Sequence, residues 1–341
     1  MTINLTLPTS WNSCTPSQLE AICLAQQQAQ MLPADQQSMA WKTNCFLALA
    51  GLEIEEANLT DEQGNHYILA CASRFPREDT HHAHTTHSSQ LSIINSQLSI
   101  PIYSYQVHYW IKEYLQWLDA IPNITHFPYP EWKSGGVTFR GPGIQLNNWT
   151  WQQYRLLKDY LDYFFKMEER LANSPYQPHS PHNSQLSIIN SQLTNAMSMV
   201  LATLYNREVN YLDETSHLPT HGYHYHPNQS TDNSKYFHNF PPIRFAVILL
   251  WWTSIATQLQ KKYPKCFGSP DKPDKKKKRK PKPQDPIAEY ARTTATLEKY
   301  MGVNEQELQQ ESYTVVLQHL QDMIKQNEEV ERMNAKMKSK K

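Results

Sequence analysis

A proline- and lysine-rich segment constrains the fold of this chain most, because it separates residues 1–270 from a short C-terminal part. The segment, DKPDKKKKRKPKPQD at residues 271–285, contains eight Lys or Arg and three Asp, which gives a net charge of +5. Prolines and mutually repelling charges keep such a segment extended, so we expect a flexible linker here. The net charge of the chain also changes sign at this segment. Residues 1–270 carry 16 basic and 20 acidic side chains (net −4), and residues 271–341 carry 16 and 12 (net +4).

Residues 1–270 are predicted to form a mainly helical domain with a small β element, which makes the fold class α+β. The run TPSQ matches a capping box, with Thr15 as N-cap and Gln18 three residues on, and starts a first helix. Asp35 is predicted to cap a second helix that ends at Gly51. Hydrophobic spacing and turn residues predict the remaining elements: strands at 52–57 and 66–74, a helix over 107–121 closed by Pro122, a strand at 137–140, and helices over 151–171, 197–204 and 241–263.

Hydrophobicity and cysteine usage predict a cytoplasmic protein with no membrane contact. The most apolar run, FAVILLWW at residues 245–252, falls well short of the ~20 residues of a membrane span, so we interpret it as a buried core helix. The first residues lack the basic and apolar regions of a signal peptide. The five cysteines are odd in number and form no C-x-x-C pair, which is typical of free buried thiols in a reducing compartment.

A decapeptide, SQLSIINSQL, occurs twice without any difference, beginning at Ser89 and again at Ser184. Structural repeats are usually diverged units of about 20–50 residues that stack on one another, and these two short copies do not fit that pattern. The string resembles translated copies of a short repetitive element from genomes of Bacteroidales and their relatives. We therefore expect residues 79–100 and 175–194 to be inserted surface loops without a function of their own.

Residues 286–341 are predicted to form a C-terminal extension of amphipathic helices. Asp285 and Pro286 match a cap and a first helical residue, and Gly302 is expected to end that helix. A last helix is expected from about Asn304. Its apolar residues alternate by three and four over fewer than three heptads, so the helix needs a second surface, either a partner or the chain's own domain. The residues predicted to bind a partner are Tyr313, Val316, Leu320, Met323 and Val330.

Enzymatic and metal chemistry find little support in the sequence. The chain has nine glycines in 341 residues, few for the glycine-rich phosphate-binding loops of nucleotide enzymes. Neither G-x-G-x-x-G nor G-x-x-x-x-G-K-[ST] occurs in it. Four histidines lie close together without a metal-binding motif, so a polar loop is the preferred interpretation: His217, His221, His224 and His226. Glu168 and Glu169 are adjacent and are predicted to be solvated, not paired for catalysis. We expect no catalytic residues, no cofactor and no metal.

The basic part of the linker is the one candidate contact for nucleic acid. Without interleaved aromatic residues, a basic run supports at most weak, sequence-blind phosphate contacts. The residues concerned are Lys275, Lys276, Lys277, Lys278, Arg279 and Lys280.

Several segments resemble a family of uncharacterised proteins from prophage and mobile-element regions of Bacteroidales genomes. These segments are INLTLPTSWNSCTPSQLEAI, MVLATLYNRE, WWTSIATQLQKKYPKCF and GVNEQELQQESYTVVLQHLQDMIKQNEEVERMNAK. The layout also resembles phage tail assembly chaperones, which pair an α-rich domain with a linker and a helical extension. Those proteins bind the tape-measure protein before the tail tube forms, and a ribosomal frameshift often produces their extension. The four lysines from Lys275 to Lys278 are compatible with such a slippery site.

The function predicted from this resemblance is a non-enzymatic, chaperone-like assembly protein that binds an amphipathic partner such as a tape-measure protein. The partner would be a phage structural protein held by apolar helix faces. Two alternatives stay open. One is a nucleic-acid-binding accessory protein of a mobile element that uses the basic linker, and the other is an enzyme of an unrecognised type.

Overall fold

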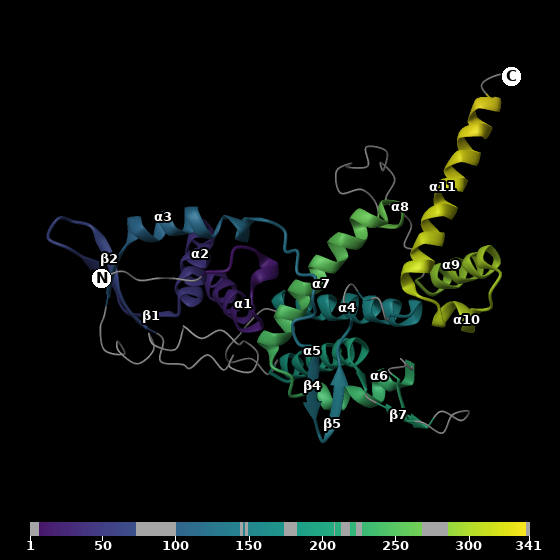
Figure 1. Ribbon diagram of the computed structural model, residues 1–341, viewed down its shortest axis with the longest axis horizontal. Coiled ribbons are helices and arrows are strands. Elements are labelled where there is room, and N and C mark those ends of the chain that lie inside the picture. Colours follow the sequence, from purple (N-terminus) through teal and green to yellow (C-terminus); the bar gives the residue numbers. More distant parts are fainter. Residues whose placement is uncertain are drawn as a thin grey trace. The chain divides into compact units, whose positions relative to one another are not determined.

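The computed structural model describes residues 7–72, 100–143, 146, 149–173, 183–207, 209–212, 219–222, 227–267 and 286–338. These residues are mainly helical with small antiparallel sheets (Figure 1), which confirms the predicted fold class. The predictions for the linker, for residues 79–99 and for three of the four clustered histidines fall on residues outside this part of the chain.

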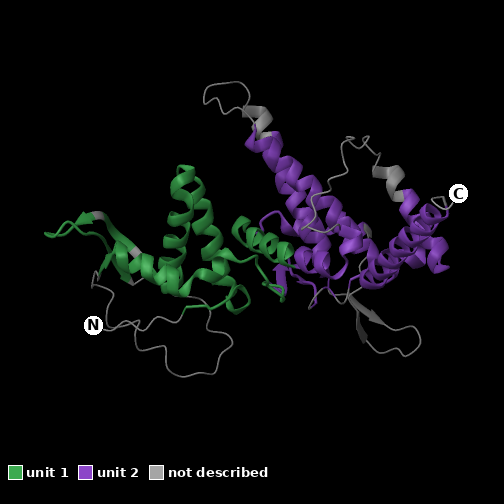
Figure 2. Cartoon of the chain, turned by 90° about the horizontal axis from the view of Figure 1, so that it is seen from above, with its two compact units in different colours: residues 1–128, 241–254 green, residues 129–240, 255–341 purple. Residues whose placement is uncertain are grey.

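The chain divides into two compact units, coloured separately in Figure 2. Unit 1 comprises residues 1–128 and 241–254, and unit 2 comprises residues 129–240 and 255–341. The sequence placed the boundary at residues 271–285, but the C-terminal helices belong to the same unit as the long helices before the linker. A local composition change shows where the chain is extended, whereas long-range packing decides which segments share a core.

Two helices at the start of unit 1 form its helical core. Helix α1 (Pro16–Gln30) begins with the predicted capping box: Gln18 N donates to Thr15 Oγ1 over 3.3 Å, and Thr15 N donates to Gln18 Oε1 over 2.9 Å. Helix α2 (Ala34–Ala50) ends at Gly51, whose φ of 69° places it in the left-handed region. The predicted cap at Asp35 is wrong, because the extended backbone of Pro33 starts the helix and leaves Asp35 in its first turn. The buried apolar residues of the two helices include Leu19, Ile22, Cys23, Phe46 and Leu49.

Unit 1 also contains a three-stranded antiparallel sheet in the order β1-β2-β3. Strand β1 (Leu52–Thr60) and strand β2 (His66–Ala72) form the predicted hairpin, and the Asp61 carboxylate accepts from Gln63 N and Asn65 N in its turn. Strand β3 (Ile100–Tyr103) was not predicted, since it follows the first decapeptide copy directly. Residue Ile100, assigned to that insert, is the first residue of this strand.

The helix predicted over residues 107–121 is shorter in the structure. Helix α3 covers Ser104–Tyr114, and a separate 3₁₀ turn covers Gln116–Asp119. Leu115, between the two, is fully buried, and its backbone ψ of 16° interrupts the helix. The helix therefore ends at this residue, before Pro122.

The most apolar helix, α7 (Pro242–Lys262), contributes its first part to unit 1 and its last part to unit 2. Among the described residues it is the one helix long and apolar enough to cross a membrane, by length and composition alone. The length argument from the sequence is thus wrong, because the helix extends well beyond FAVILLWW. Core helices pass the same test, and four apolar side chains of its first part are buried: Phe245, Val247, Ile248 and Trp251.

All five cysteines are described, and all are free, as predicted. Cys14, Cys23, Cys45 and Cys71 are buried, and Cys266 is partly exposed. Burial raises the pKa of Cys14, Cys23 and Cys45 to about 12, so these thiols stay protonated and unreactive at neutral pH.

Unit 2 is built on two long helices that pack against each other, α4 (Trp151–Ala172) and α5 (Asn183–Leu204). Around them lie six shorter elements: β4 (Glu131–Ser134), β5 (Val137–Arg140), β6 (Asn206–Arg207), β7 (Val209–Leu212), β8 (Pro219–Gly222) and α6 (Pro227–Ser234). The predicted strand at 137–140 is present, and it pairs with β4 and β6, which were not predicted. Buried Gln153 joins the two helices, because its Nε2 donates to the Thr203 carbonyl over 2.8 Å.

The second decapeptide copy is helical in the structure, so the expected loop at residues 175–194 is wrong from Asn183 onward. Residues 184–193 form the first half of α5, continuous with the predicted helix over 197–204. Residues 188 and 190–192 of the copy are exposed, whereas Ala196 beyond it is buried. The copy contains neither glycine nor proline, so a helix can extend through it into the following residues.

The C-terminal part of unit 2 contains a short helix α8 (Pro264–Phe267) and then α9 (Pro286–Met301), α10 (Glu305–Gln310) and α11 (Tyr313–Lys338). Helix α9 ends at Gly302, as predicted, with a φ of 70°. The single last helix expected from Asn304 is wrong, because extended backbone at Glu311 separates α10 from α11.

Candidate functional site

Helix α11 carries all five residues predicted to bind a partner, and its first turn is fixed to the start of α4 through the backbone. Trp151 N donates to the Glu311 carbonyl over 2.8 Å, and Tyr313 N donates to the Trp149 carbonyl over 3.3 Å. An isolated β-bridge joins Thr150 to Ser312 between them. These bonds explain why the chain breaks before Tyr313 and where α11 begins.

The first half of α11 is packed into unit 2. Tyr313, Val316 and Leu317 are each at most 2% exposed, and the ring of Tyr313 stacks on Tyr154 of α4 with centroids 5.4 Å apart. Burial, and then the nearby Tyr263, raise the pKa of the Tyr313 phenol to about 12. This part of the helix completes a core.

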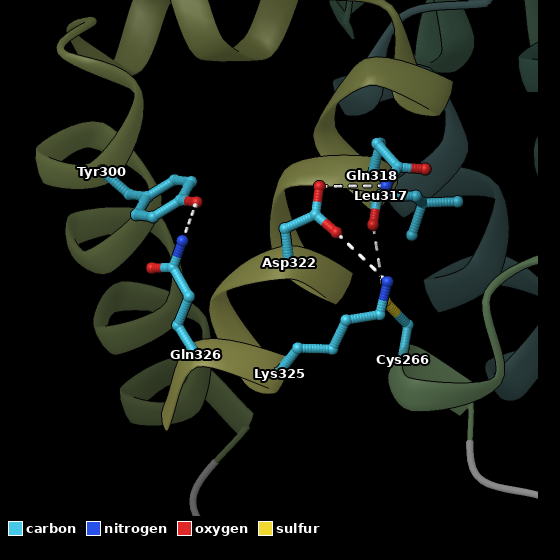
Figure 3. Close-up of polar contacts among 7 residues, drawn as sticks. All are labelled: Cys266, Tyr300, Leu317, Gln318, Asp322, Lys325 and Gln326. Carbon is cyan, nitrogen blue, oxygen red and sulfur yellow. Dashed lines mark hydrogen bonds and ion pairs between the residues drawn. The ribbon is translucent and has the colours of Figure 1, made fainter. Parts of the chain in front are cut away.

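Polar contacts continue along the middle of α11, as Figure 3 shows. Gln326 Nε2 donates to the Tyr300 hydroxyl of α9 over 3.3 Å, and the Cys266 thiol of α8 donates to the Leu317 carbonyl over 3.5 Å. Within the helix, Asp322 accepts from Gln318 and from Lys325, and these bonds lower the pKa of the Asp322 carboxyl. The bonds of Gln326 and of Cys266 therefore link α11 to α9 and α8, and the other contacts in Figure 3 lie within α11.

An ion pair further along the helix joins α8 to α11. Lys265 Nζ lies 2.7 Å from Glu328 Oε2, and both side chains are more than a third exposed. The hydrogen bond from Lys265 lowers the pKa of the Glu328 carboxyl. This pair marks the point at which the packed part of α11 ends.

Beyond Glu328, the apolar side chains of α11 are exposed. Val330 is 55% exposed, Met333 62% and Met337 61%, while residues 329–337 are exposed throughout. Spacings of three and four place these three side chains on one stripe of the helix. We call Val330, Met333 and Met337 the free stripe.

The structure thus separates the predicted partner-binding residues into three groups. Tyr313 and Val316 are buried in unit 2, Leu320 and Met323 are half-buried, and Val330 alone is exposed. The free stripe adds two methionines to the predicted set. Their spacing from Val330 was the signal in the sequence, but only the structure shows that the docked surface ends before them.

Other candidate residues offer less. Glu168 and Glu169 are both exposed on α4. Among the described residues, no group of three or more His, Cys, Asp or Glu is arranged to hold a metal ion. A polar depression of about 400 Å³ is lined by Ser191, Gln192, Thr194, Asn195 and His238. Ser191 and Gln192 belong to the second decapeptide copy. The imidazole of His238 has no acidic or basic side chain as a partner within this lining.

Comparison with protein-family models, with curated proteins and with solved structures finds no match for this chain. The resemblance to prophage proteins and to tail assembly chaperones stays a prediction.

Proposed function

We propose that this chain is a non-enzymatic, chaperone-like assembly protein of a phage-tail type system, which binds an amphipathic partner such as a tape-measure protein through the free stripe of α11. The observation that carries the proposal is the contrast along this helix. Its first half is fixed in unit 2, whereas Val330, Met333 and Met337 are each more than half exposed.

A helix held at one end suits the capture of another helix. The docked half fixes the direction of α11, so the free stripe is already ordered before a partner arrives and less entropy is lost on binding. Methionine side chains adapt to irregular surfaces, which favours contact with a long and variable amphipathic helix. Exposed apolar stripes of this kind mark interaction surfaces.

The small size of the free stripe favours transient binding. Three side chains can bury about 300 Å² of apolar surface, or roughly 7 kcal/mol at about 25 cal/mol per Å². Association itself costs several kcal/mol, so the net affinity is modest for each contact. A chaperone that must release its partner before assembly needs a contact of this strength, and several copies along one partner would add avidity.

The test is co-expression of the full chain with a phage tape-measure protein, followed by co-purification. We expect Val330→Asp and Met333→Asp each to abolish co-purification, because a charge would enter the apolar contact. Ala335→Asp adds the same charge on the opposite side of the helix and should retain the partner. The proposal fails if the wild-type chain does not retain the partner, or if all three variants behave alike.

A further inference from the structure

The sheet of unit 1 carries tyrosines near its hairpin turn, on the face opposite buried Ile102. In the register of β2 with β3, Ile68 pairs with Ile102, which is 3% exposed, and the neighbouring pair is Tyr67 with Tyr103. Because neighbouring residues of a strand point to opposite faces, Tyr67 and Tyr103 lie on the face away from Ile102. The following helix, α3, places Tyr105 beside them.

The tyrosine rings form a continuous row. The centroids of Tyr67 and Tyr103 are 5.5 Å apart, and those of Tyr103 and Tyr105 are also 5.5 Å apart with an interplanar angle of 23°. Tyr105 is 62% exposed, and Tyr109, one helical turn further, is 58% exposed. We call these four residues the tyrosine face. Tyrosines in such rows are enriched at interfaces, because they combine apolar rings with hydroxyl groups that tolerate water.

Carboxylates occur on strand β1 and in the hairpin turn of the same sheet. Glu56 is exposed and pairs with Leu69, on the same face of the sheet as Tyr67, and Asp61 and Glu62 lie in the turn of the hairpin. Hydrogen bonds from Asn65 lower the pKa of Asp61, so its carboxylate is charged at neutral pH. The described residues of unit 1 contain nine Asp or Glu and three Lys or Arg. A cationic partner is therefore favoured, and a phosphate backbone is repelled.

Strand β1 adds a third recognition element. In the described part of the chain it pairs only with β2, and it therefore forms an edge of the sheet in Figure 1. Its register with β2 shifts twice, between Ile54 and Glu56 and between Glu56 and Leu59. An extended peptide can pair with the backbone of such an edge.

We propose that the tyrosine face is a docking surface for an extended, lysine- and arginine-rich segment of a protein partner. The tyrosine rings would bind Lys or Arg side chains of this segment by cation–π contact. The carboxylates of Glu56 and of the hairpin turn would form ion pairs with other Lys or Arg side chains of the same segment. This surface lies in unit 1 and does not involve α11, so the inference stands apart from the proposed function.

The test uses a fluorescein-labelled peptide with the sequence of residues 272–283, KPDKKKKRKPKP, as a model basic segment. It is titrated by fluorescence anisotropy against the full chain in which Lys275–Lys278, Arg279 and Lys280 are replaced by Gln, so that the chain's own segment does not compete. We expect Tyr105→Leu to weaken binding about fivefold, because one cation–π contact contributes about 1 kcal/mol. Glu56→Gln should weaken binding about threefold.

A matched control lies on the same helix. Tyr114 is 53% exposed and lies on the opposite side of α3 from Tyr105, so Tyr114→Leu should leave the affinity unchanged. Leucine keeps the apolar area and the helix propensity in both variants, and far-UV circular dichroism confirms the fold of each. The proposal is overturned if the peptide does not bind, or if Tyr105→Leu and Tyr114→Leu bind it equally. Val330→Asp, which tests the proposed function, should leave this affinity unchanged.

Discussion

Residues 313–324 and residues 327–337 of α11 carry the same spacing of apolar side chains, yet the two halves have opposite surroundings. In the first half, Val316 is fully buried against unit 2, and in the second half Val330 is 55% exposed. Two valines at equivalent positions of one repeat therefore have different roles: one completes a core, and the other is available to a partner. A periodic stripe predicts which face of a helix is apolar, but not what covers that face.

The contacts of the two halves explain the difference. The first half lies beside the start of α4 and beside α8, whose residues bond to its backbone, and the ion pair of Lys265 with Glu328 joins α8 to α11 further along the helix. The helix continues for ten residues after that pair to Lys338. The length of α11 depends on the helix propensity of its own residues. It exceeds the length of the surface on which the helix docks.

The largest effect is expected from truncation. Removal of residues 271–341 takes away the docked half of α11 and uncovers Trp149, Tyr154 and Tyr263, which are each at most 5% exposed in the full chain. We expect unit 2 to lose its cooperative thermal transition and to aggregate or bind a hydrophobic dye. Removal of residues 330–341 alone should leave the melting temperature within about 1 °C. Similar melting curves for the two truncated chains would show that the first half of α11 is not part of the core.

A charge placed in each half provides a sharper comparison. Val316→Asp buries an uncompensated carboxylate, and we expect it to lower the free energy of unfolding by more than about 3 kcal/mol. Val330→Asp, at an exposed position, should change it by less than about 0.5 kcal/mol. Urea denaturation followed by circular dichroism measures both. If Val330→Asp is as destabilising as Val316→Asp, the second half of the helix is also buried in solution.

Alkaline pH is expected to destabilise the docked half of α11 through Tyr313, whereas its exposed half contains no such buried group. The pKa of Tyr313 rises from its ordinary value of 10.0 to about 12, because burial disfavours the phenolate. Between pH 10 and pH 12 the unfolded chain releases this proton and the folded chain keeps it. The contribution of the protonated phenol is thus complete below pH 10 and is lost as the pH rises toward 12. Tyr313→Phe should remove this part of the pH dependence in urea titrations at pH 9 to 11, and an unchanged slope would contradict the burial of Tyr313.

The smallest effect is expected where docking ends. Lys265→Ala removes the ion pair with Glu328. Both side chains are partly exposed, so the pair contributes no more than about 1 kcal/mol to the stability of the folded chain. Hydrogen exchange should become faster for the backbone amides of residues 325–329, and added salt should reduce the difference between variant and wild type. Glu329→Gln, at the adjacent exposed position, provides the control. Unchanged exchange in Lys265→Ala would move the end of the docked segment toward Leu320.

Local signals in the sequence predicted the ends of several elements correctly. The capping box at Thr15, the left-handed glycines at Gly51 and Gly302 and the hairpin turn from Asp61 all act within about five residues. Each satisfies backbone groups near its own position in the chain, and distant parts of the molecule have little influence on it.

The candidate site could be predicted only in part for the same reason. The spacing of Tyr313, Val316, Leu320, Met323 and Val330 placed the apolar face of α11 correctly, and it extends to Met333 and Met337. Which of these residues are accessible depends on α4, α8 and α9, which lie far away in the sequence. No local pattern reports how far a neighbouring helix extends.

The sequence by itself determined the helical class, the apolar faces of the long helices and most of their caps, because periodicity and capping are short-range properties. Tertiary structure decided the rest. Pairing with β5 makes a strand of residues 206–207, and the bonds from Trp149 and Trp151 separate α10 from α11. The same bonds fix the start of α11 at the surface of α4, the ion pair of Lys265 with Glu328 joins it to α8, and residues 329–337 beyond that pair are exposed. These bonds and the ion pair join groups 63 to 164 residues apart along the chain, whose proximity exists only in the folded protein.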